Sequence, residues 1–146
     1  MTPQFIGRIL ESRVFFIVSR IVLVSMFLGA GLDKLLHFQG TVAEMALHGL
    51  MPPGAFAVAA VATLLIASAL IILNVAAWLG FGALGIFVAL TIPIAHPFWS
   101  FQGDEGLLHF HVAAEHISLI GGLMAGAILC HLQAQGIGSA VARPGL

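Results

Sequence analysis

The chain has 146 residues, of which 60% are hydrophobic and 8% are charged, and its formal net charge is −1. A soluble domain carries about 25% charged residues, so this composition excludes an ordinary soluble domain and indicates an integral membrane protein. The basic residues are scattered and there is one cysteine, Cys130, which excludes a basic nucleic-acid-binding patch, an intramolecular disulfide and a multi-cysteine metal site.

The first long apolar run, residues 14–36, predicts a membrane-spanning helix after a short polar lead. The run is long enough to cross a hydrocarbon core of about 30 Å, and further spans follow it, so we interpret it as a span rather than a signal peptide. Asp33, Lys34 and His37 mark its far end. Next, residues 41–50 predict a short amphipathic helix at the membrane interface, ended by a Pro-Pro-Gly turn.

Residues 55–95 are apolar almost without interruption. At 1.5 Å per residue they would extend roughly 61 Å as one helix, twice the thickness of the membrane core. Asn74 lies near the midpoint and predicts the turn of a helical hairpin, with spans at 55–73 and 75–95. Pro93 predicts a kink near the end of the second of these helices. Trp78 and Trp99 are spaced to lie in the two interfacial belts.

The fourth predicted span covers residues 108–132. Small residues recur at four-residue spacing along it, as they do along the second span, which predicts closely packed helix seams. Such stripes also fit the contact face of a homo-oligomer, and the sequence does not separate the two. The predicted fold is all-α: an integral membrane four-helix bundle formed by a single transmembrane domain of residues 1–146.

Four spans place both termini on one side of the membrane. The terminal segments carry Arg8, Arg13 and Arg143, whereas the two longer loops carry only Lys34. Loops rich in lysine and arginine stay in the cytoplasm, which is the positive-inside rule, so this distribution predicts cytoplasmic termini. We expect a multi-pass protein of a bacterial inner (plasma) membrane, with the polar residues of the loops facing outward.

Ionisable residues gather between residues 91 and 122, in a chain that is otherwise mostly apolar. On a helix, Glu105, His109 and His116 share one stripe, whereas His111 and Glu115 lie roughly 100° to 120° around from it. We favour His96, Glu115 and His116 over His109, which we expect in the loop. The outward ends of the other spans add Asp33, Lys34 and His37 to the candidate ligand-binding residues. Asp33 and His37 are four residues apart, so on a helix we expect them to pair with each other.

Three interpretations of this cluster stay open. Imidazole nitrogens at this spacing suit a transition metal, for which His96, His111 and His116 are the candidate ligands, and facing histidines suit a haem. A quinone site is also compatible, because histidine and glutamate can exchange protons with the hydroxyls of a quinol, and we prefer a quinone to a haem or a metal. The third interpretation is a structural polar cap.

Arg20 lies about two turns inside the first predicted span. A charge in this position is costly unless the side chain extends to the headgroups or finds a partner. Because no acid lies at matching depth, we also count Arg20 among the candidate ligand-binding residues, with a carbonyl, a phosphate or a lipid headgroup as its partner.

The chain resembles the DoxX family of small four-helix membrane proteins over roughly residues 13–130. The first span has that family's order of an arginine, small residues, a glycine and a Lys-Leu pair before an aromatic, here Arg20, Gly31, Lys34, Leu35 and Phe38. The Gly-Leu-Met-Pro turn, the His-Pro-Phe-Trp segment and the Ile-Ser-Leu-Ile-Gly-Gly run in the last span also fit. Where the family often has an acid, a basic residue and an asparagine, this chain has Thr63, Asn74 and His116.

The resemblance implies a membrane subunit linked to quinone-dependent redox systems. We therefore expect either a redox subunit whose outward His/Glu cluster binds a ligand or cofactor, or a non-catalytic scaffold or accessory subunit that docks a partner protein. A channel or transporter is a third class, disfavoured because no chain of charges crosses the membrane. The expected partners are the lipid bilayer and either a redox protein or further copies of this chain, and no nucleic acid.

Overall fold

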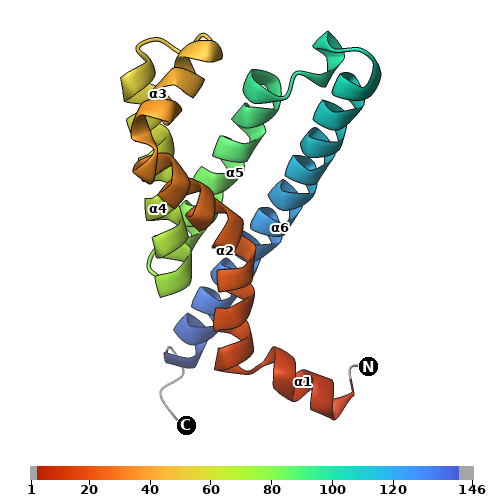
Figure 1. The fold of residues 1–146 in the computed structure, drawn as a ribbon. Coiled ribbons are helices and arrows are strands. Elements are labelled where there is room, and N and C mark those ends of the chain that lie inside the picture. The colour runs from red at the N-terminus through yellow and green to blue at the C-terminus, as the bar shows by residue number, and fades with distance from the viewer. Residues whose placement is uncertain (1–2, 142–146) are drawn as a thin grey trace.

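The computed structural model describes residues 3–141, with side chains up to residue 135, and within this range it is helical without any strand. The elements are α1 (Gln4–Leu10), α2 (Arg13–Leu36), α3 (Phe38–Leu47), α4 (Pro53–Leu73), α5 (Ala77–Ala95), the 3-10 turn η1 (Phe98–Ser100) and α6 (Gly103–Val141) (Figure 1). Four segments are long and apolar enough to cross a membrane: α2, α4, α5 with η1, and α6. The all-α membrane fold with four spans is thus confirmed.

Local chemistry explains where several helices begin and end. The Ser12 hydroxyl accepts a hydrogen bond from Phe15 N at 3.1 Å and caps the start of α2. Pro53 is the first residue of α4. A backbone N–H at this position would have no acceptor within the helix, so the N–H that proline lacks costs no hydrogen bond. Asn74 ends α4 in the left-handed conformation, with φ 56°, which confirms the predicted hairpin turn.

Several predicted boundaries differ from the structure. The fourth span begins at Gly103 rather than at residue 108, because Asp104 and Glu105 lie in the first turn of α6, where acidic side chains favour a helix N-terminus. At its other end α6 continues to Val141, well past residue 132. The predicted interfacial helix is α3, shifted three residues toward the N-terminus. Arg143, which contributed to the predicted orientation, lies outside the described residues.

The core lies between α2, α4, α5 and α6. Its fully buried side chains come from all four helices: Val24, Phe27, Leu64, Ile71, Phe81, Leu84 and Leu123. Large apolar side chains such as Val22, Ile66 and Ile86 are exposed on the outer faces. A surface of this kind suits contact with lipid tails rather than with water.

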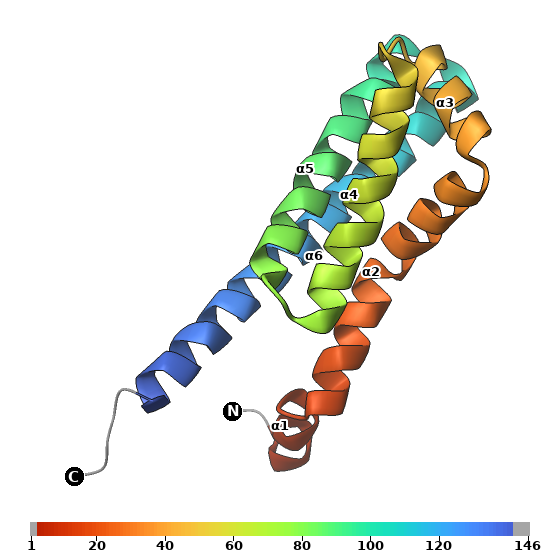
Figure 2. The same cartoon turned by 90° about the vertical axis from the view of Figure 1, so that its left-hand side faces the viewer.

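The helices pack in the order α2, α4, α5, α6, and this row does not close into a complete ring. Figure 2 shows α4 and α5 side by side along the bundle. Helices α2 and α6 cross and touch locally, where Arg20 of α2 reaches Cys130 of α6, and they diverge toward the end that carries α3 (Figure 1). The predicted seam of small residues on α6 is therefore only half correct. Gly122 and Gly126 face Leu23 and Phe81, whereas Ala114 and Ser118 are exposed.

Candidate functional site

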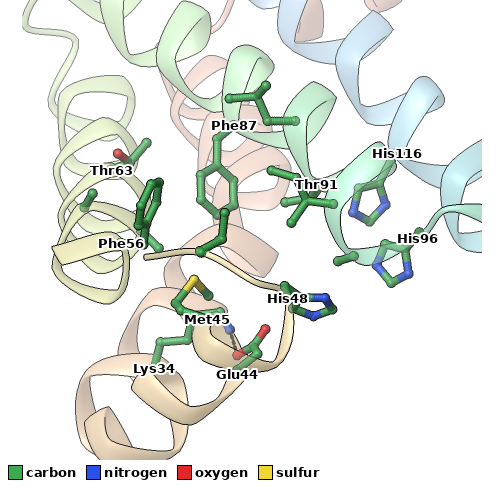
Figure 3. Close-up of a pocket in the computed structure, with 16 residues that line it drawn as sticks. Lys34, Glu44, Met45, His48, Phe56, Thr63, Phe87, Thr91, His96 and His116 are labelled. Atoms are coloured by element: carbon green, nitrogen blue, oxygen red, sulfur yellow. Dashed lines mark hydrogen bonds and ion pairs between the residues drawn. The ribbon is translucent and has the colours of Figure 1, made fainter. Parts of the chain in front are cut away.

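A cavity of about 340 Å³ lies at the end of the bundle where α2 and α6 diverge. Helix α3 and the segment after it border the cavity on one side, and α4, α5 and the outer part of α6 border the other (Figure 3). Most of its lining is apolar, including Met45, Phe56, Phe87 and Ile94. Its volume lies within the 300–1,000 Å³ range typical of small-molecule pockets, and its lining has the character that a hydrophobic molecule would require.

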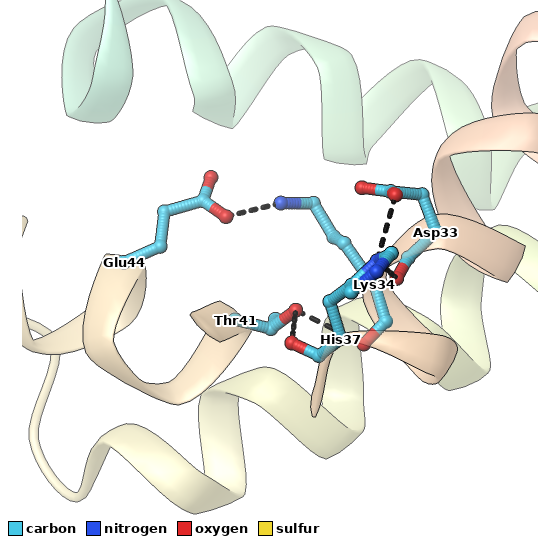
Figure 4. Close-up of polar contacts among 5 residues, drawn as sticks. All are labelled: Asp33, Lys34, His37, Thr41 and Glu44. Atoms are coloured by element: carbon cyan, nitrogen blue, oxygen red, sulfur yellow. Dashed lines mark hydrogen bonds and ion pairs between the residues drawn. The ribbon is translucent and has the colours of Figure 1, made fainter. Parts of the chain in front are cut away.

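Charged and polar groups gather at one part of the cavity wall. Lys34, at the end of α2, forms an ion pair with Glu44 of α3, and both line the cavity (Figure 4). The buried Thr41 hydroxyl donates a hydrogen bond to the Lys34 carbonyl oxygen at 3.0 Å. These two contacts attach α3 to the end of α2, so the position of α3 over the cavity depends on polar interactions.

Three histidines from two segments meet beside the cavity. The Nδ1 atoms of His96 and His109 are 3.2 Å apart and form a hydrogen bond, in which one ring is the donor and the other is the acceptor. The rings of His96 and His116 are in edge contact, with centroids 5.3 Å apart, and both line the cavity. His109 stacks on Phe101 at 4.4 Å.

The histidine that faces the cavity has unused hydrogen-bonding capacity. His116 Nδ1 is buried and has no hydrogen-bond partner among the described residues. A buried polar atom without a partner costs free energy, and this nitrogen is enclosed by protein, so the rest of the His116 ring forms part of the cavity wall. His48, just after α3, supplies a further imidazole from the other side of the cavity (Figure 3).

The other predicted site residues lie elsewhere. Asp33 and His37 are exposed and pair with each other at 3.0 Å, as their spacing on one helix predicts. His111 and Glu115 are exposed on α6, around the helix from His116. Arg20 lies near the opposite end of the bundle, by the end of α4. Of the predicted residues, the structure brings Lys34, His96 and His116 to the cavity.

The metal prediction named His96, His111 and His116, and only the first and last of these are neighbours. Within the described part of the chain, no group of three or more His, Cys, Asp or Glu side chains has an arrangement that could hold a metal ion. Of the three named residues, His96 and His116 line the cavity.

Sequence reasoning missed Glu44, His48 and His109. Glu44 and His48 both lie within the predicted interfacial helix of residues 41–50, and its polar residues were the available signal. We expected His109 near the end of a loop that continued to residue 107. Helix α6 begins at Gly103 instead, so His109 lies on the helix and on the same face as His116, as the helical periodicity predicts.

Replacing Glu44 with glutamine is expected to loosen α3 without unfolding the protein. The ion pair with Lys34 is partly exposed, with side-chain exposures of 20% and 43%, and such pairs contribute at most about 1 kcal/mol. Amide hydrogen exchange in residues 38–47 should accelerate, while the melting temperature stays close to that of the wild type. Glu105→Gln, an exposed acid on α6, is the control. Unchanged exchange in α3 would show that the ion pair does not hold this helix.

Comparison with known proteins gives one family match. Residues 15–97, which run from the start of α2 through α3, α4 and α5 to the residue after His96, match the model of the family described as DoxX. The match therefore includes most residues that line the cavity, but not α6 with His109 and His116. No curated protein and no solved structure matches the chain.

Proposed function

The chain belongs to the DoxX family, a family of membrane proteins often linked to redox systems, and from this premise we propose that it is the quinone-binding membrane subunit of a redox system. The site is the cavity between α3, α4, α5 and α6. The observation that carries the proposal is the pair of neighbouring imidazoles, His96 and His116, on the wall of a mostly apolar cavity.

A quinone has the chemistry that this cavity accommodates. Its ring is flat and apolar on its faces, which suits the aromatic side chains of Phe56 and Phe87. Its oxygens are polar, and an imidazole can donate a hydrogen bond to a quinone carbonyl or accept one from a quinol hydroxyl. We assign these hydrogen bonds to His116 and His96, with Lys34 as a further donor across the cavity.

The first experiment measures binding of a short-tailed quinone to the detergent-purified protein by isothermal titration calorimetry. We expect His116→Ala to weaken binding about tenfold, since one hydrogen bond contributes about 1 kcal/mol or slightly more. His111→Ala is the matched control, because it removes an exposed imidazole five residues away on the same helix. Undetectable binding to the wild type, or equal loss in both variants, would refute the quinone site.

A second candidate function is a membrane scaffold that docks a partner protein. The observation that favours it is the exposure of Glu115 and His111 on the outer face of α6. An ionisable side chain within a spanning helix is costly when it faces lipid, and a polar partner helix would relieve that cost. Loss of a co-purifying protein in Glu115→Ala, with quinone binding intact, would favour the scaffold.

The inner membrane of a bacterium, with the cavity facing outward and the termini in the cytoplasm, is the location that we propose. The support is the distribution of basic residues, with Arg8 and Arg13 near the N-terminus and Lys34 at the cavity end. Accessibility of single cysteines introduced at exposed positions, such as Gln102 and Gln4, to an impermeant reagent in intact cells tests this orientation.

A further inference from the structure

Arg20 joins three helices at the end of the molecule opposite the cavity. Its Nη1 donates to the Ile71 carbonyl oxygen at 2.9 Å, in the last turn of α4, and its Nη2 donates to Cys130 Sγ of α6 at 2.8 Å. The guanidinium carbon lies 4.1 Å from the ring centre of Phe16. Only 4% of the residue is exposed, so Arg20 does not extend into water.

The charge of this guanidinium has no full counter-charge in the described part of the chain. The carboxylates in ion pairs there, Asp33 and Glu44, both lie at the cavity end. The carbonyls that end α4 carry only partial negative charge. A guanidinium has five N–H groups, of which two have acceptors here, and the buried Nε has none. Burying a cation in this way is costly unless an anion accompanies it.

A hollow of about 200 Å³ next to Arg20 could admit such an anion. It lies between α2 and α6, where these helices cross, and its other walls are mostly apolar, with Leu23, Phe81 and Leu129 among them. Ser19, Ala125 and Leu129 line it and are also exposed, so it opens on the outer surface of the bundle. A mostly apolar hollow that opens on a lipid-facing surface suits an acyl chain.

A second hollow, of about 430 Å³, adjoins the first at Cys130, which lines both. It lies at the turn between α4 and α5, and its walls include the polar side chains of Asn74, His131 and Gln133 as well as Trp78. Because α4 ends here, this is the level at which the apolar span gives way to the headgroup region. We call the two hollows together the groove. It provides apolar walls, the cation of Arg20 and a polar end.

We propose that this groove binds one anionic phospholipid. Its phosphate accepts hydrogen bonds from the remaining Nη–H groups of Arg20, an acyl chain lies along Leu23 and Leu129, and the polar head reaches Asn74 and His131. The charge of Arg20 selects an anionic lipid, and the apolar groove selects a lipid over a soluble phosphate. The site is separate from the cavity and does not depend on quinone binding.

Native mass spectrometry of the detergent-purified full chain tests the proposal, using phosphatidylglycerol and phosphatidylcholine with identical acyl chains. We expect one phosphatidylglycerol per chain at concentrations where phosphatidylcholine does not bind. Arg20→Gln should lower its occupancy about tenfold, because it removes charge-assisted hydrogen bonds. Arg13→Gln is the control, since it removes an exposed cation from the start of the same helix. Soluble glycerol phosphate should not displace the lipid.

A second variant keeps Arg20 in place, in case Arg20→Gln does not fold. Gly122 lines the hollow, and a Cβ built there meets only Leu23 Cδ1, at 3.4 Å, so Gly122→Leu should fill the groove while the helices stay packed. Loss of phosphatidylglycerol in Gly122→Leu supports the site. Equal binding of the two lipids, full phosphatidylglycerol binding in Gly122→Leu, or displacement by glycerol phosphate would each overturn the proposal.

Discussion

Replacing Gly80 with leucine is expected to destabilise the protein by about 3 kcal/mol. At this glycine α5 approaches α4 so closely that an added Cβ would lie 2.7 Å from the Ala67 carbonyl oxygen and 2.9 Å from Ile71 Cγ1. A backbone oxygen cannot rotate away as a side chain can, so the two helices would have to separate. The measurement is the melting temperature of the purified variant in detergent.

Gly82→Leu is the matched control for this prediction. It lies on the same helix, is exposed, and has no atom within 4 Å of an added Cβ. We expect its melting temperature to equal that of the wild type, because an added leucine there meets only lipid or detergent. Equal melting temperatures for the two variants would show that the close contact of α4 and α5 does not hold the fold together.

Replacing Thr63 with tryptophan is expected to abolish quinone binding, with a loss of affinity of at least about a hundredfold. Thr63 lies on the wall of the cavity, near Phe56 and Phe87 and away from the histidines (Figure 3). An indole there would occupy the space needed for the ring or the start of its tail, and a rigid packed interior cannot readily make room. Quinone extracted from the purified protein and quantified by chromatography provides the measurement.

Val58→Trp controls for the size of the new side chain. Val58 is on the same helix, is 57% exposed and does not line the cavity. It should retain quinone at the wild-type level. If Thr63→Trp also retains quinone while remaining folded, the quinone binds somewhere other than this cavity, and the assignment of His96 and His116 to it fails with that result.

Local features of the sequence were enough to predict the spans and several contacts within single helices. Length and hydropathy place α2, α4, α5 and α6, because a spanning helix must satisfy its own backbone hydrogen bonds and present apolar side chains to lipid. Asn74 predicts the hairpin turn, and the four-residue spacing of Asp33 and His37 predicts their contact. The spans, the turn and this contact each depend only on residues that are close to one another in the sequence.

The prediction was weaker where a boundary depended on competing signals. The composition around Asp104 and Glu105 is polar and predicted a loop. In the structure both residues lie in the first turn of α6, because acidic side chains stabilise the N-terminus of a helix. That shift brings His109 onto the helix and beside His96. The periodicity of α6 separates His116 from His111, but it does not show which of the two faces points into the bundle.

Only the tertiary structure decided which polar groups from different helices meet. Arg20 bonds to residues 51 and 110 positions away in the sequence, and Lys34 pairs with Glu44 because α3 folds back over the end of α2. The divergence of α2 from α6, which creates the cavity, also follows from how whole helices pack. Hydropathy and periodicity describe one helix at a time, whereas the distances between helices depend on the shapes of all the side chains between them.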